Sequence, residues 1–213
     1  MENNIKTGPR DVFLHLAGVV GLYVVVIAFG SLVFQLINIK FPDPALGEFR
    51  QFGDGLRWPL AVLVVVFPVY LSLSYFLQSE LVRFPEKKEL KTRKWMLYFT
   101  LFASGTVIVA DLISLIFSFL SGELTVRFVL KVLTVLLVAA AVFAYYLWNL
   151  KKAAPALRDP EMRFFVWGVI ALVVAAAVTG FVFAGSPGRA RLVRVDERRV
   201  NDLYALQSEI TNF

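Results

Sequence analysis

The chain has 213 residues, of which 58% are hydrophobic and 18% are charged, and its formal net charge is +6. Soluble domains are about half apolar and about a quarter charged, so this composition predicts a membrane protein. With no cysteine and one histidine, His15, the chain cannot form disulfides, iron–sulfur clusters or a multi-histidine metal site by itself. Its basic residues cluster at the ends of apolar runs, which indicates anionic lipid headgroups as partners and argues against nucleic acid.

Apolar segments long enough to cross a bilayer, about 20 residues each, recur along the chain. The first is too long for the apolar region of a signal peptide and lacks a small-residue cleavage site, so we expect it to be retained. The pattern predicts an all-α polytopic transmembrane helix bundle. A four-helix membrane domain over 12–150 is followed by a fifth span. The five predicted spans are 12–39, 58–78, 95–120, 126–149 and 164–184.

Lysine and arginine counts in the loops predict the orientation. The N-terminus (1–11) and the loops after the second and fourth spans carry 12 basic residues, against 4 in the two loops of the opposite face. Five further arginines follow the fifth span and weaken this bias without reversing it. The counts therefore predict a cytoplasmic N-terminus, a basic cytoplasmic loop over 151–163 and an extracytoplasmic tail over 185–213.

The tail contains apolar residues at spacings of three and four, which predicts an amphipathic helix. This stripe runs to the last residue, so we expect it to form a surface for a partner protein. A basic helix lying on lipid headgroups is an equally good interpretation. The stripe consists of Val200, Leu203, Leu206, Ile210 and Phe213.

The third predicted span contains Asp111 near its middle. An ionised carboxylate there costs about 2.5–3.5 kcal/mol and should face the bundle with a partner. Counting from the turn near Gly122 places Lys131 of the fourth span at a similar depth, so we expect an intramembrane polar pair. At 100° per residue, polar side chains on the same faces form a stripe. Its members are Thr100, Ser104, Ser114, Ser118 and, beside Lys131, Thr134.

Two interpretations of the Asp111–Lys131 pair stay open. A buried ion pair would fix the packing of the third and fourth spans, whereas a proton or ion relay would make the pair functional. His15 projects away from the small and polar stripe of the first span, so we interpret it as a headgroup-level or packing residue.

Several sequence runs are similar to those of an uncharacterised bacterial membrane family, a domain of unknown function with four predicted spans. They include Thr7 to His15, Arg57-Trp58-Pro59, Arg93-Lys94-Trp95, Ser121 to Thr125 with Arg127 and Lys131, and Tyr145 to Trp148. The resemblance covers roughly residues 8–150, leaving the fifth span and the tail outside it. It implies a multi-pass protein of the bacterial inner membrane but brings no activity.

No nucleophile elbow, zinc-protease helix, Walker loop or dinucleotide fingerprint is present in the sequence. We therefore expect a protein that is not an enzyme and needs no cofactor. The favoured hypothesis is a scaffold, assembly or sensory subunit that presents its extracytoplasmic helix to a protein partner or to a second copy. The alternative is a small ion or proton channel or transporter subunit that uses Asp111 and Lys131.

Overall fold

The computed structural model describes residues 8–41, 52–84, 90–122, 124–151, 159–185 and 187–211. Within these ranges the chain forms helices and no strands. Five of the helices are long and apolar enough to cross a membrane, and each contains one predicted span, so the all-α polytopic prediction is confirmed. The helices are α1 (Pro9–Lys40), α2 (Phe52–Arg83), α3 (Lys91–Leu120), α4 (Val126–Lys151), α5 (Pro160–Ala184) and α6 (Pro187–Thr211).

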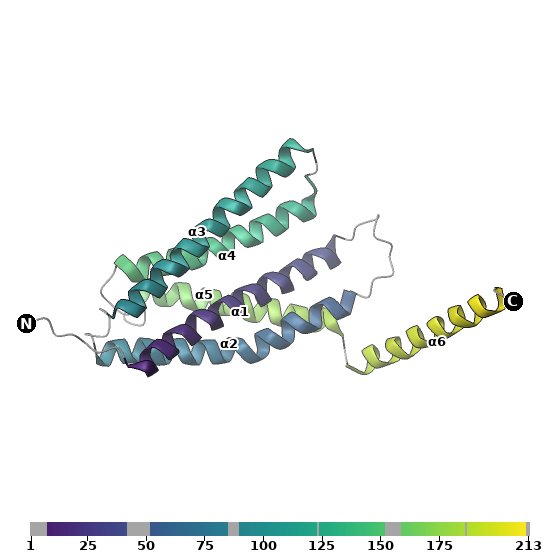
Figure 1. Cartoon of the computed structure of the whole chain (residues 1–213), viewed down its shortest axis with the longest axis horizontal. Helices are drawn as coiled ribbons and strands as arrows, with labels where there is room; N and C mark the ends of the chain where they lie inside the picture. Colours follow the sequence, from purple (N-terminus) through teal and green to yellow (C-terminus); the bar gives the residue numbers. More distant parts are fainter. Residues whose placement is uncertain are drawn as a thin grey trace, which may run out of the picture.

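The spans run alternately up and down, with α1 at the centre (Figure 1). Helix α1 contacts α2, α3, α4 and α5, whereas α5 packs on α1 and α2. We call the end at which α1 begins the N-terminal side of the bundle, and the end at which α5 finishes the C-terminal side. The lysine and arginine counts predict that the N-terminal side faces the cytoplasm, and this orientation stays a prediction.

The main core lies between α1, α2 and α5. It is aliphatic and well buried: Leu32 and Leu56 are 0% exposed and Leu63 is 2% exposed. Helix α5 approaches this core through Gly180, where an added Cβ would lie 2.9 Å from side-chain carbons of both Leu32 and Leu60. A small residue at a helix contact lets two backbones approach closely, which is the usual packing device within membranes.

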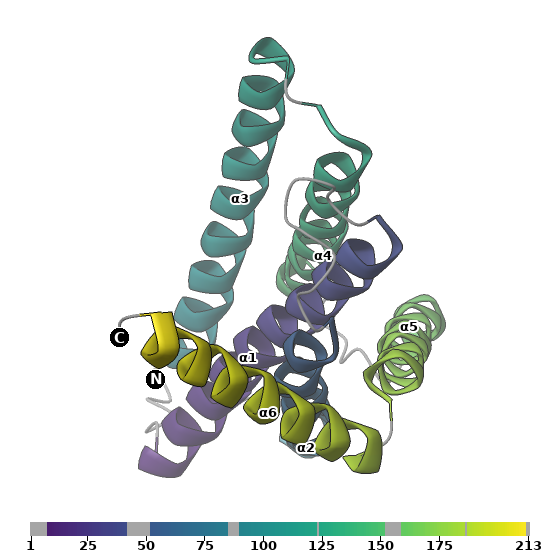
Figure 2. The same cartoon turned by 90° about the vertical axis from the view of Figure 1, so that its right-hand side faces the viewer.

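Helices α3 and α4 form a hairpin that opens toward the C-terminal side (Figure 2). Near the N-terminal side it joins α1 through a second core of Leu22, Leu97 and Tyr146. Farther along α3 the side chains become exposed, reaching 70% at Phe117 and 78% at Leu120. Exposed apolar surface on such a helix is suited to contact with lipid chains.

Three of the four tryptophans lie near the start of a helix and are exposed. Trp58, Trp95 and Trp167 fall within the first eight residues of α2, α3 and α5 and are 65–77% exposed. Trp95 also stacks on Phe99, with ring centroids 5.9 Å apart. Exposed indole rings near helix ends match the aromatic belt of membrane proteins.

Helix α6 is set apart from the five spans. Gly185, with φ of 71°, lies between α5 and α6 and allows the chain to leave the axis of α5. In Figure 1, α6 extends past the ends of the spans on the C-terminal side. Its described side chains are exposed, so this helix contributes little to the core.

Candidate functional site

A polar cavity of about 80 Å³ lies between α1, α2, α3 and α4, toward the N-terminal side. That volume has room for several water molecules, at about 10–15 Å³ each. Leucine, valine, methionine and glycine form part of the lining. The polar lining residues are His15, Tyr70, Ser74, Gln78, Arg93, Tyr145, Tyr146 and Asn149.

Two hydrogen bonds to α4 connect neighbouring helices across the cavity. Arg93 Nη2 in the first turn of α3 donates to Asn149 Oδ1, 3.1 Å away, near the end of α4. Gln78 Nε2 of α2 donates to the Tyr145 hydroxyl at 3.2 Å. The positions follow from the antiparallel hairpins, which bring the end of α2 and the start of α3 beside the end of α4.

The deeper wall is formed by hydroxyl groups. The Tyr146 hydroxyl lies close to the Thr100 side chain, and the Tyr70 hydroxyl lies close to Ser74. Thr100 is fully buried, and its Oγ1 donates to the Met96 carbonyl at 3.0 Å. The wall is therefore polar although it lies several turns inside the helix ends.

His15 belongs to this cavity, which corrects its interpretation as a residue placed away from the inner face. Its Nδ1 donates to the Asp11 carbonyl oxygen, 2.8 Å away. The other ring nitrogen, Nε2, takes no part in this hydrogen bond. The correction has a geometric reason. Helix α1 contacts four other helices, α2, α3, α4 and α5, so more than one face of α1 points into the bundle.

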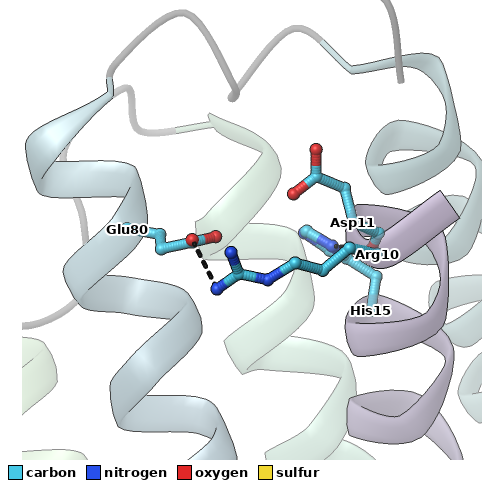
Figure 3. Close-up of polar contacts among 4 residues, drawn as sticks. All are labelled: Arg10, Asp11, His15 and Glu80. Atoms are coloured by element: carbon cyan, nitrogen blue, oxygen red, sulfur yellow. Dashed lines mark hydrogen bonds and ion pairs between the residues drawn. The ribbon is translucent and has the colours of Figure 1, made fainter. Parts of the chain in front are cut away.

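An ion pair lies beside His15 at the edge of the bundle (Figure 3). Arg10 Nη2 of α1 is 3.5 Å from Glu80 Oε1 of α2, and the Arg10 guanidinium also lies 5.8 Å from the centre of the Phe76 ring. The Arg10 side chain is 70% exposed. A pair this open contributes at most about 1 kcal/mol, so it positions α1 on α2 only weakly.

The structure does not bring Asp111 and Lys131 together. Asp111 Oδ2 is buried yet has no hydrogen-bond partner among the described residues, and Lys131 Nζ instead lies 5.6 Å from the centre of the Phe34 ring of α1. The expected ion pair is absent, and α3 and α4 diverge toward the turn that joins them (Figure 1). Equal depth was therefore an insufficient criterion for contact.

The predicted polar stripe is internal over only part of its length. Thr100 and Ser104 are buried, Ser118 is half-buried and Ser114 is exposed. The hydroxyls of Ser104 and Thr134 donate to carbonyls of their own helices, at Leu101 and Leu130. The change follows the divergence of α3 from the bundle, so the inner face ends about halfway along the helix.

The predicted tail surface lies on α6. Val200, Leu203 and Leu206 are 47%, 65% and 55% exposed. The side chain of Ile210 and the whole of Phe213 lie outside the described residues. The described part of the stripe is therefore open along one face of a helix that stands apart from the spans.

Comparison with known families covers the first four spans. The model of the family described as Domain of unknown function (DUF5671) matches residues 11–146. The chain belongs to this DUF5671 family. The match agrees with the sequence resemblance and includes nearly the whole polar cavity, whereas α5 and α6 lie beyond it. No curated protein and no solved structure matches the chain.

The residues of the cavity were not recognised as a group from the sequence of this DUF5671 member. By sequence alone Arg93 belongs to a basic loop between two predicted spans, and Tyr145 and Tyr146 lie near a span end, where aromatic residues commonly form an interfacial belt. One signal was available: Gln78, Arg93 and Asn149 each lie within two turns of an end of a predicted helix on the same side of the membrane. Adjacent hairpins bring such ends together.

Proposed function

We propose that the chain is a non-enzymatic subunit of the bacterial inner membrane, of a scaffold, assembly or sensory type, that presents α6 on the extracytoplasmic side to a partner protein. The observation that carries the proposal is the position of α6. It lies past the ends of the spans (Figure 1) and exposes an apolar stripe.

The stripe suits a helical partner. Val200, Leu203 and Leu206 recur every three residues, so they lie on one side of α6. A partner helix with its own apolar face can cover such a stripe in the manner of a coiled coil.

Introduction of negative charge on one face of α6 tests the proposal. The full-length protein carrying Leu203→Glu and Leu206→Glu is compared with one carrying Ala205→Glu and Ser208→Glu, which add the same charge to another face of the same helix. Both pairs are exposed. The complex is purified through a tag and its mass and stoichiometry are measured.

Loss of a stoichiometric component in the first variant, with its retention in the second, supports the proposal. Chemical crosslinking then distinguishes a second copy from a different protein. Equal composition and mass in the wild type and both variants contradicts the proposal. Protease cleavage of the α6 tail in liposomes that becomes faster only in the first variant, with no change in protein composition, would identify lipid as the surface that α6 contacts.

An ion or proton pathway is the second candidate function. The observation in its favour is the buried Asp111 Oδ2 without a protein hydrogen-bond partner in the described part of the chain, since intramembrane carboxylates commonly mark such pathways. Flux through proteoliposomes that disappears in Asp111→Asn, with folding intact, supports this candidate. Absence of flux in the wild type removes it.

A further inference from the structure

The polar cavity lies at the depth of lipid headgroups. Helix α1 has 32 residues and α3 has 30, so they are about 48 and 45 Å long at about 1.5 Å per residue. The hydrocarbon core of a bilayer is only about 30 Å thick. When α1 and α3 are centred in the membrane, each of their ends therefore extends about 8–9 Å beyond the hydrocarbon core.

The charged and amide groups of the cavity fall within this outer zone. Arg93 is two residues from the start of α3, and Asn149 is two residues from the end of α4. Gln78 and His15 are five and six residues from the ends of their helices. At about 1.5 Å per residue, these groups lie about 3–9 Å from the helix ends.

The cavity is rich in hydrogen-bond donors. Arg93 contributes a planar guanidinium to the lining, and its Nη2 donates to Asn149 Oδ1. Because Asn149 accepts through Oδ1, its amide hydrogens are available as donors. The Tyr145 oxygen accepts from Gln78, so the Tyr145 O–H is available in the same way. The described lining includes an arginine and no aspartate or glutamate.

A ligand that complements these groups is an anion with several acceptor oxygens. A phosphate group meets the requirement, since guanidinium groups bind phosphate through paired hydrogen bonds of high strength. Half-exposed His15, Gln78, Arg93 and Asn149 show that the cavity reaches the protein surface. A ligand can therefore enter without separation of the helices.

We propose that the cavity between α1, α2, α3 and α4 binds a phosphate group, with Arg93 as the charged contact and Tyr145 and Asn149 as further donors. The phosphate belongs either to the headgroup of an anionic lipid or to a small soluble anion. This site is separate from the α6 surface, so it stands or falls independently of the proposed partner.

Thermal unfolding of the full-length protein in a neutral detergent tests the binding. Two probes are titrated separately: inorganic phosphate, against chloride at the same ionic strength, and a short-chain phosphatidylglycerol, against the matching phosphatidylcholine. A ligand that binds only the folded state raises Tm, and the rise grows with the logarithm of ligand concentration once that concentration exceeds Kd. A response to phosphatidylglycerol alone assigns a lipid headgroup, and a response to inorganic phosphate assigns a soluble anion.

Substitution of neighbouring cations locates the site. Arg93→Gln should weaken the apparent Kd by roughly 10-fold or more, because a hydrogen bond to a charged group is worth about 1.5–3 kcal/mol. Lys94→Gln is the matched control: it removes the same charge from the next residue of α3, which is exposed and outside the cavity lining. It should change Kd less than about twofold, as expected for a screened surface charge.

A cavity-filling variant separates binding inside the cavity from attraction to surface charge. Ser74→Leu occupies part of the lining and leaves Arg93 in place, and it should reduce the Tm response to the probe. Each variant is compared with its own ligand-free Tm, so a general loss of stability does not imitate a loss of binding. The proposal is overturned if neither probe raises the Tm of the wild type, if Arg93→Gln and Lys94→Gln weaken binding equally, or if Ser74→Leu leaves Kd unchanged.

Discussion

A small side chain at Gly180 is required for α5 to approach α1 and α2. An added Cβ would lie 2.9 Å from Leu32 Cδ1 and 2.9 Å from Leu60 Cδ2, whereas carbon atoms prefer about 3.5–4.0 Å. Both leucines are almost fully buried, so they have little room to move. Gly180→Ala should therefore overpack this contact, at a cost of about 1–3 kcal/mol in the free energy of unfolding.

Gly168 provides the matched control. It lies in the same helix, and an added Cβ would meet no atom within 4 Å. Replacement of either glycine by alanine gains about 1 kcal/mol of helix propensity, which cancels when the two variants are compared. The difference between Gly168→Ala and Gly180→Ala thus isolates the overpacking.

Thermal unfolding in detergent measures this difference. For a chain of this size, 1 kcal/mol shifts Tm by about 2–4 °C, so Gly180→Ala should unfold about 2–12 °C below Gly168→Ala. Gly180→Val should unfold at a still lower temperature, because its side chain adds more volume at the same contact. Equal Tm values for the two alanine variants would refute the close approach of α5 described here.

Two further predictions concern single side chains. Asp111→Asn should leave the free energy of unfolding unchanged or higher. The carboxylate has no ion pair to lose among the described residues, and an ionised carboxylate at mid-span costs about 2.5–3.5 kcal/mol. A large loss of stability, measured by unfolding in detergent, would instead indicate a partner for Asp111. Asp159→Ala should lower the free energy of unfolding by about 1 kcal/mol, because Asp159 Oδ1 accepts a hydrogen bond from the Glu161 N–H at the start of α5. Asp159→Asn keeps an acceptor oxygen at this position, so it should lower the free energy of unfolding by less.

The sequence was sufficient to predict the spans because each is apolar and longer than the bilayer requires. A segment such as 12–39 carries this information within itself, and α1 extends the prediction by only a few residues. The sequence does not show which helices pack against each face of a given helix. Counting residues from the turn relates Asp111 of α3 to Lys131 of α4. The sequence contains no measure of how far apart the two helices of this hairpin lie.

The polar cavity was missed for a related reason. Its members come from four helices, and each taken alone has a simpler explanation: Arg93 as a topology signal, Tyr145 as an interfacial aromatic and His15 as a headgroup residue. Only the packing of α4 beside α1 and α3 makes them one site. Contacts between helices that are distant along the chain therefore determine the site, whereas local composition determines the spans.

The central position of α1 has a consequence for how the protein is made. Helix α1 is synthesised first, yet its contacts include α4 and α5, which emerge much later from the ribosome. The seat for Gly180 is formed by Leu32 of α1 and Leu60 of α2, so it is complete once the α1–α2 hairpin has formed. Docking of α5 onto that seat is thus a later step, which a chain truncated before Pro160 cannot perform.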